Sequence, residues 1–145
     1  MSRDYRNIVA WQRGHELTLR IYRVTKEFPA DERYGLTSQL RRAMYGVPSN
    51  IVEGSARDTK KDYLRFLFIA LASLKEAEYF LLLAHDLGYL SPADHNELTE
   101  LVNRTFAALD GLIKAVRKEV GPVGALWATL IAGLITALGR HLVSI

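Results

Sequence analysis

Apolar residues recur at helical spacing in the first part of the chain. Between residues 4 and 28, alternating steps of four and three residues place them on one face of an α-helix. They are Ala10, Gly14, Leu17, Ile21, Val24 and Phe28. The segment FPADERYG follows, and its proline and glycine are typical of a short polar connection. The pattern predicts a first helix that packs in a bundle through one apolar face.

Three further helices are expected beyond this connection, over residues 36–54, 59–88 and 91–119. Thr59 and Asp62 resemble a capping box, which marks the start of the third helix. Ser91, Pro92 and Asp94 supply a cap, a first-turn proline and an acidic residue at the start of the fourth. Since the connections are short and no strand-like alternation occurs, the predicted fold class is all-α, an antiparallel up-down four-helix bundle.

The C-terminal part of the chain is apolar, so we assign the bundle to residues 1–119 and an additional helical extension to residues 120–145. Residues 120–139 carry no charge and are enough to cross a bilayer. Bulky and small side chains fall on opposite faces of this segment, which a helix facing lipid does not need. We therefore expect a fifth helix that docks on the bundle or on other subunits. A membrane anchor over residues 120–142 and an engineered or misread extension are the alternatives.

The second predicted helix contains a conflict, because Pro48 interrupts the helical spacing of LRRAMYGVPSNIVEG. A proline inside a helix removes a backbone donor, typically costs about 3 kcal/mol and frees a carbonyl one turn earlier. Ser49 and Asn50 can supply hydrogen bonds there, and Glu53 can hold an arginine. Gly54 can close the helix. We interpret the stretch as the specification of a bent helix and not as an active site.

The third predicted helix is apolar nearly all the way round in YLRFLFIALASL. A helix in a single four-helix bundle needs only one buried stripe, so the rest of this apolar surface needs a further partner. Association of subunits is the simplest explanation, and we expect a homo-oligomer.

Composition and motifs argue against an enzyme. The absence of cysteine excludes disulfides, thiolate metal sites and cysteine nucleophiles. The sequence has no Glu-x-x-His motif, no Gly-rich phosphate loop and no nucleophile elbow. Glu53 and Glu76 could act as an acid–base pair. We favour the alternative that Arg41 or Arg42 pairs with these carboxylates in a structural network, and expect no metal or cofactor.

Positive charge is concentrated in the first half of the chain. Residues 1–65 carry 13 Lys or Arg and 8 Asp or Glu, whereas residues 66–145 carry 6 and 8. The overall net charge is only +3. Such an asymmetry is compatible with an acidic partner such as nucleic acid, although an ordinary solvated surface is the alternative.

The basic residues suggest a track for phosphate groups. Arg6, Arg13 and Arg20 are spaced by seven residues, which keeps them on one side of the first helix. The other candidates lie around the interrupted second helix and the turn after it. The candidate nucleic-acid-binding residues are Arg6, Arg13, Arg20, Arg41, Arg42, Lys60 and Lys61. If both groups share a face, they would bind RNA or DNA through the backbone without reading bases.

Several motifs occur together in an order and at separations that identify a resemblance. They are FPADERYGLTSQLRRA, VPSNIVEGSAR, and the Tyr-x-x-Phe-Leu and Ser-Leu-x-Glu elements of YLRFLFIALASLKEAE, the last ending at Glu76. Over about residues 5–118 the chain resembles the four-helix-bundle proteins encoded in intervening sequences of bacterial 23S ribosomal RNA genes. That family includes the accessory variability determinant of diversity-generating retroelements. Its Pro-Ser-Asn-Ile-x-Glu-Gly signature begins here at Pro48, and Tyr45, Gly46 and Val52 depart from the usual pattern.

The resemblance implies a ring-shaped homopentamer with a basic surface linked to RNA or DNA, and no catalytic residues. In the retroelement branch it also implies a reverse transcriptase as a partner. The N-terminal residues are charged throughout and have no apolar signal core, so a cytoplasmic location is expected. A protein-interaction scaffold without nucleic-acid binding, with or without a membrane-anchoring tail, is the competing function.

Overall fold

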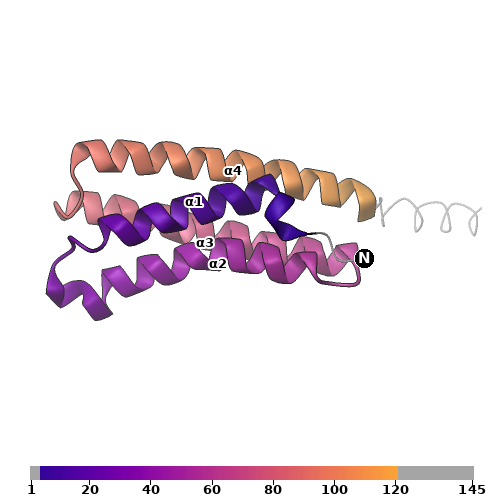
Figure 1. Cartoon of the computed structure of the whole chain (residues 1–145), viewed down its shortest axis with the longest axis horizontal. Coiled ribbons are helices and arrows are strands. Elements are labelled where there is room, and N and C mark those ends of the chain that lie inside the picture. Colours follow the sequence, from indigo (N-terminus) through magenta and orange to yellow (C-terminus); the bar gives the residue numbers. More distant parts are fainter. Residues whose placement is uncertain (1–3, 121–145) are drawn as a thin grey trace, which may run out of the picture.

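The computed structural model describes residues 4–120, which form an antiparallel four-helix bundle (Figure 1). The helices are α1 (Val9–Val24), α2 (Leu36–Ser55), α3 (Lys60–Asp86) and α4 (Pro92–Val120). Two short 3₁₀ segments, η1 (Tyr5–Asn7) and η2 (Ala30–Tyr34), precede α1 and α2. The predicted all-α fold class and the four-helix architecture are confirmed. The predicted fifth helix lies outside the described residues.

The first helix is shorter at both ends than its apolar pattern predicts. Asp4 caps η1 by accepting a hydrogen bond from the Arg6 N–H, and Ile8 is extended, so α1 begins only at Val9. Phe28 lies beyond the end of α1 but is only 7 % exposed, and its ring lies 5.7 Å from that of Tyr89. A connecting residue therefore continues the core that the helix begins.

The starts of α3 and α4 have the predicted caps. The Thr59 hydroxyl accepts a hydrogen bond from the Asp62 N–H at 3.0 Å, and the Ser91 hydroxyl accepts one from the Asp94 N–H at 3.1 Å. These bonds satisfy donors that have no acceptor inside their helices. At the other end of α3, Gly88 has a φ of +76°, which allows the Tyr89 N–H to bond to the carbonyl of Ala84 and end the helix.

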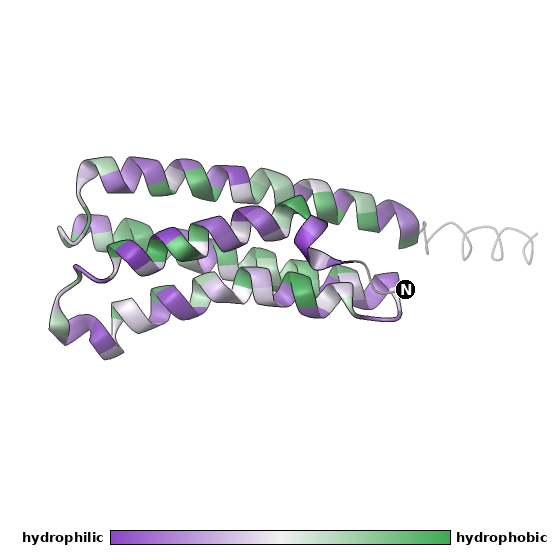
Figure 2. Cartoon of the chain, viewed as in Figure 1, coloured by the Kyte–Doolittle hydropathy of each residue, from purple (hydrophilic) through white to green (hydrophobic). Residues whose placement is uncertain are grey.

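Each helix contacts its two neighbours in the order α1, α2, α3, α4 and back to α1. The apolar stripes of the four helices meet along the axis, where many side chains are fully buried, among them Leu17, Ile21, Leu40, Met44, Leu67, Leu74, Leu98 and Leu109. Figure 2 shows hydrophobic and hydrophilic residues alternating along the helices, as one-sided burial requires. The α1–α2 and α3–α4 connections share one end of the bundle (Figure 1).

Candidate nucleic-acid interface

The residues around Pro48 satisfy backbone carbonyls of α2 within the helix itself. The Ser49 hydroxyl donates to the carbonyl of Tyr45, and the Asn50 amide donates to that of Gly46, each at 2.7 Å. These are the two carbonyls that follow Met44, whose carbonyl loses its helical donor to the proline. Ser49 and Asn50 thus bond to carbonyls in the turn that the proline interrupts. These carbonyls lie one and two residues after the freed carbonyl of Met44.

Close helix packing surrounds the same segment. A Cβ atom on Gly14 of α1 would lie 3.3 Å from Val47 Cγ1 and 3.6 Å from Pro48 Cδ. Next to α3, a Cβ on Gly54 would lie 2.8 Å from both Tyr63 Cδ2 and Phe66 Cβ. Pro48 and Gly54 are both buried. The signature therefore brings α2 close to both α1 and α3, consistent with a structural role.

The carboxylates of Glu53 and Glu76 lie at different heights in the bundle. Arg42 donates to Glu76 across the α2–α3 seam at 3.0 Å, whereas Glu53 binds Arg57, which follows the end of α2. Because Arg42 precedes Glu53 by eleven residues, their Cα atoms are roughly 16 Å apart along the helix axis. The two carboxylates form two separate ion pairs and not an acid–base pair.

The candidate residues Arg6, Arg13 and Arg20 are each bound to carboxylates. Arg6 lies in η1 and pairs with Asp4 at 2.9 Å, and Arg13 on α1 pairs with Glu16 at 3.1 Å. Arg20 reaches α4, where its guanidinium lies 2.6 Å from Asp94 and 2.8 Å from Glu97.

The cluster around Arg20 has a clear electrostatic effect. The hydrogen bond from Arg20 holds the pKa of Glu97 below its usual range. The hydroxyl of Ser91, and after it Arg20, lowers the pKa of Asp94. Hydrogen bonding to Glu97 raises the pKa of Arg20 in turn. Arg20 therefore joins α1 to α4, and its charge is largely compensated by the protein.

Arg41 and Arg42 are adjacent in sequence but point to different neighbours. Arg42 faces α3 through Glu76. Arg41 faces the end of α1, where its Nε donates to the Thr25 hydroxyl at 2.8 Å and its guanidinium lies 4.7 Å from the Tyr22 ring centroid. No carboxylate in residues 4–120 pairs with Arg41.

The two lysines at the start of α3 lie at the other end of the bundle from Arg41. Lys60 pairs with Glu119 near the end of α4 at 2.7 Å, and Lys61 is exposed. The seven candidate residues are thus distributed over several seams and do not form one continuous track. Their role in nucleic-acid binding stays a prediction.

A basic pocket lies at the connection between α1 and α2. It has a volume of about 300 Å³ and is lined by Thr25, Lys26, Phe28, Pro29, Ala30, Arg33, Thr37 and Arg41. Of these, only Arg41 was among the predicted binding residues. The sequence signal for this pocket was the presence of basic residues on either side of FPADERYG. Their convergence on one pocket depends on how the connection folds.

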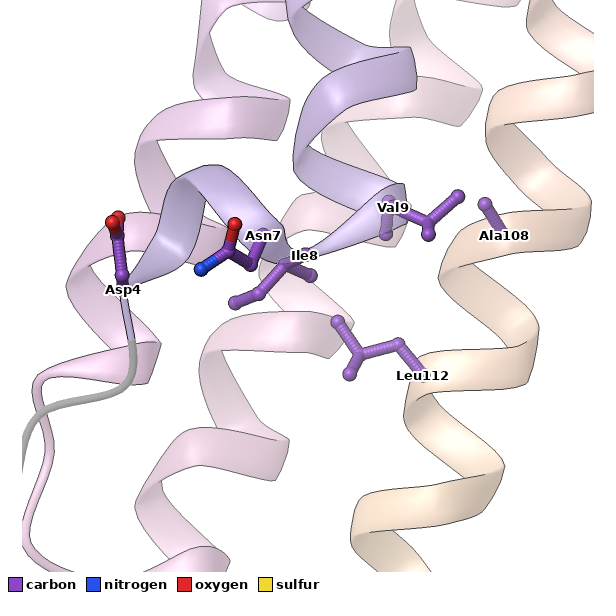
Figure 3. A pocket seen from close by; sticks show the side chains of 7 residues that line it. Asp4, Asn7, Ile8, Val9, Ala108 and Leu112 are labelled. Atoms are coloured by element: carbon purple, nitrogen blue, oxygen red, sulfur yellow. The ribbon is translucent and has the colours of Figure 1, made fainter.

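Two grooves lie on either side of α4, and the lining of the first includes Asp4 and Asn7 as well as apolar residues. The groove in Figure 3, of about 530 Å³, lies between Ile8 and Val9 at the start of α1 and Ala108 and Leu112 on α4. The second, of about 380 Å³, lies between α3 and α4 and is lined by Lys75, Glu78, Tyr79, Leu81, Leu82, His95, Thr99 and Val102. The second groove adjoins the exposed part of the apolar third helix.

Two further findings concern the described part of the chain alone. Within residues 4–120, no group of three or more His, Asp or Glu side chains is arranged to hold a metal ion. None of the helices in this range combines the length and the apolar character that a bilayer crossing requires. Residues 120–142, named above as a potential anchor, lie almost entirely beyond it.

Comparisons with known proteins were informative about the family and the fold. The model of the 23S rRNA-intervening sequence protein family matches residues 6–111. The chain also resembles the crystal structure of a protein with unknown function from the S23 ribosomal protein family of Bacteroides thetaiotaomicron. The two share 22% sequence identity and a TM-score of 0.68, over 73% of this chain and 99% of that one. No curated protein matches the chain.

Proposed function

The chain belongs to the 23S rRNA-intervening sequence protein family, and from this premise we propose that it is a non-enzymatic, cytoplasmic homo-oligomer whose basic surface binds RNA or DNA. The pentameric state that we propose follows from the family resemblance, as does a reverse transcriptase as a nucleoprotein partner. The unpaired cations and the exposed apolar surfaces of the bundle support the binding and assembly parts of the proposal.

The observation that carries nucleic-acid binding is the group of cations beside the α1–α2 connection. Arg23, Lys26, Arg33 and Arg41 have no ion-pair partner within residues 4–120. Cations without a protein carboxylate are available to neutralise phosphates and release counterions. A basic face repeated in each subunit of an oligomer would also strengthen a weak contact by avidity.

The observation that supports assembly is the apolar surface of α3 that the bundle leaves exposed. Phe68, Ile69, Tyr79 and Leu82 are 41%, 40%, 59% and 49% exposed. Tyr79 and Leu82 also line the apolar groove between α3 and α4. A second copy of the chain is the partner that we propose for this surface, because exposed apolar patches of this kind mark interaction sites.

Binding to labelled RNA and DNA, followed by fluorescence anisotropy over a series of salt concentrations, tests the proposal. We expect log affinity to fall linearly with log salt. Arg41→Gln should weaken binding for all sequences and reduce the salt slope by about 1. Arg104→Gln is the matched control, because Arg104 is an exposed arginine on α4 that is not among the candidate binding residues. Absence of binding by a confirmed oligomer, or binding that is independent of salt, would contradict the proposal.

A protein scaffold without nucleic-acid binding is the competing function. Affinity purification with and without nuclease separates the two, because a direct protein partner survives nuclease treatment. Loss of all partners on nuclease treatment is the result expected for a nucleic-acid-binding assembly.

A further inference from the structure

We propose that the basic pocket between α1 and α2 binds a single dianionic phosphate group, either free phosphate or the phosphate at the end of a nucleic-acid strand. The strand-end form rests on the proposed function, whereas the site for free phosphate does not. The pocket is concave, has a volume of about 300 Å³ and has three cations but no carboxylate in its lining. A phosphate monoester with a second pKa near 6 is largely dianionic at neutral pH.

Three separate segments supply the cations. Lys26 follows the end of α1, Arg33 lies in η2, and Arg41 lies on α2, one turn after Thr37. The turn at Phe28 and Pro29 brings these segments together, and the burial of Phe28 fixes it to the core. The cations thus converge on one cavity because the connection is folded, and not because they share a helix face.

Arg41 is held ready for an anion. Its Nε is bound to the Thr25 hydroxyl, and Thr25 is 3% exposed and itself donates to the carbonyl of Ile21 at 2.8 Å. The guanidinium also lies over the Tyr22 ring in a cation–π contact. These contacts leave the terminal guanidinium nitrogens to donate, and such a planar pair of donors matches phosphate oxygens. Less side-chain entropy is lost when a ligand binds a group already held in this way.

Thr37 supplies a neutral donor. Thr37 is 7% exposed and lines the pocket. Its hydroxyl makes no hydrogen bond to any other described residue. An unused hydroxyl beside three cations is the donor expected in an anion site.

Nearby carboxylates do not fill the pocket. Glu32 is turned toward other partners, since one of its oxygens caps the Leu36 N–H at 2.8 Å and the other accepts from the Tyr89 hydroxyl at 3.2 Å. Glu27 and Asp31 are exposed on the same connection and do not line the cavity. The positive charge of the pocket is therefore not cancelled from within.

The test uses the full chain with inorganic phosphate, and then one oligonucleotide with and without a 5′-phosphate. We expect saturable phosphate binding in a calorimetric or NMR titration, weakened about tenfold by Arg33→Gln and also reduced by Thr37→Val. Arg104→Gln is the matched control, because Arg104 is an exposed arginine on α4 outside the pocket. The 5′-phosphate should strengthen strand binding in the unaltered protein but not in Arg33→Gln.

The outcomes separate this site from the proposed function. Phosphate binding that depends on Arg33 and Thr37, without any strand binding, would support the pocket and contradict nucleic-acid binding. The pocket would be overturned by two results together. Phosphate binding would be absent, or equal in Arg33→Gln and Arg104→Gln, and the affinity for the strand would not depend on its 5′-phosphate. The proposed function would still stand.

Discussion

Two glycines of the bundle show that the effect of an added methyl group on stability depends on the packing around the residue. Gly54 on α2 has no room, because an added Cβ would lie 2.8 Å from side chains of α3. Gly111 on α4 is exposed, and an added Cβ would meet nothing within 4 Å. Glycine within a helix is unfavourable relative to alanine in both places, so only the packing differs.

We therefore expect alanine substitutions at these positions to have opposite effects. Gly54→Ala should lower the free energy of unfolding by about 1–2 kcal/mol, because overpacking exceeds the gain in helix propensity. Gly111→Ala should raise it by roughly 0.5–1 kcal/mol. Urea denaturation measures both. Equal effects of the two substitutions would show that the α2–α3 contact is not as close as described.

The Arg20 cluster makes a prediction about pH. The carboxyl groups of Asp94 and Glu97 have pKa values below their ordinary ones of about 4 in the unfolded chain. Their contribution to stability is therefore present above pH 4 and is lost as the pH falls through the lowered values. The midpoint temperature of thermal unfolding should be lower for Arg20→Gln than for the unaltered protein at pH 7. This difference between the two midpoints should shrink below pH 4. A difference that stays constant on acidification would contradict this role.

At the scale of the elements, the start of α1 and the C-terminal half of α4 border a groove whose lining is partly apolar. The groove of Figure 3 joins Val9, which is 57% exposed, to Ala108 and Leu112. The end of α4 at Val120 lies at the same end of the bundle (Figure 1). From Val120, the apolar residues 121–145 are within reach of this groove, since Leu112 lies roughly 12 Å back along the helix.

We expect this C-terminal segment to pack on the bundle and cover the groove. Deleting residues 121–145 should lower the thermal stability or reduce the size of the assembly, because apolar burial is lost. Val9→Asp in the full chain should have a similar effect, and Tyr34→Asp, at an 88% exposed position, is its control. Membrane partitioning of the full chain, with an unchanged oligomer after truncation, would favour an anchor instead.

At the scale of the whole molecule, the basic pocket and the groove between α3 and α4 lie on different seams of the bundle. Unpaired cations lie beside the α1–α2 connection, whereas the exposed apolar side chains of α3 lie along α3 and its groove with α4. Such separation allows subunits to associate through one surface and leave the other accessible.

Tyr79→Glu should therefore weaken assembly without unfolding the bundle, because Tyr79 is 59% exposed in the single chain. Light scattering at micromolar concentration measures the mass, and circular dichroism measures the helix content. Leu19→Glu, a comparable exposed position on α1, is the control. A well-folded monomer of the unaltered chain would rule out the oligomer altogether.

The helices and their order could be predicted from the sequence alone. Apolar spacing reports one-sided burial, and Thr59 and Ser91 cap helices through atoms only three residues away. Such signals are local, so they need no knowledge of the neighbouring helices. The resemblance to the family rests on sequence motifs such as VPSNIVEGSAR, which can also be recognised without the tertiary structure.

The partners of the polar residues were decided by the tertiary structure. Arg41 and Arg42 are neighbours in sequence, yet one binds Thr25 beside α1 and the other binds Glu76 on α3. The contact of Pro48 with Gly14 and the convergence of Arg33 with Arg41 depend likewise on the connection and on the register between helices. No residue near them in sequence signals that register, because it is set by how whole apolar faces interlock.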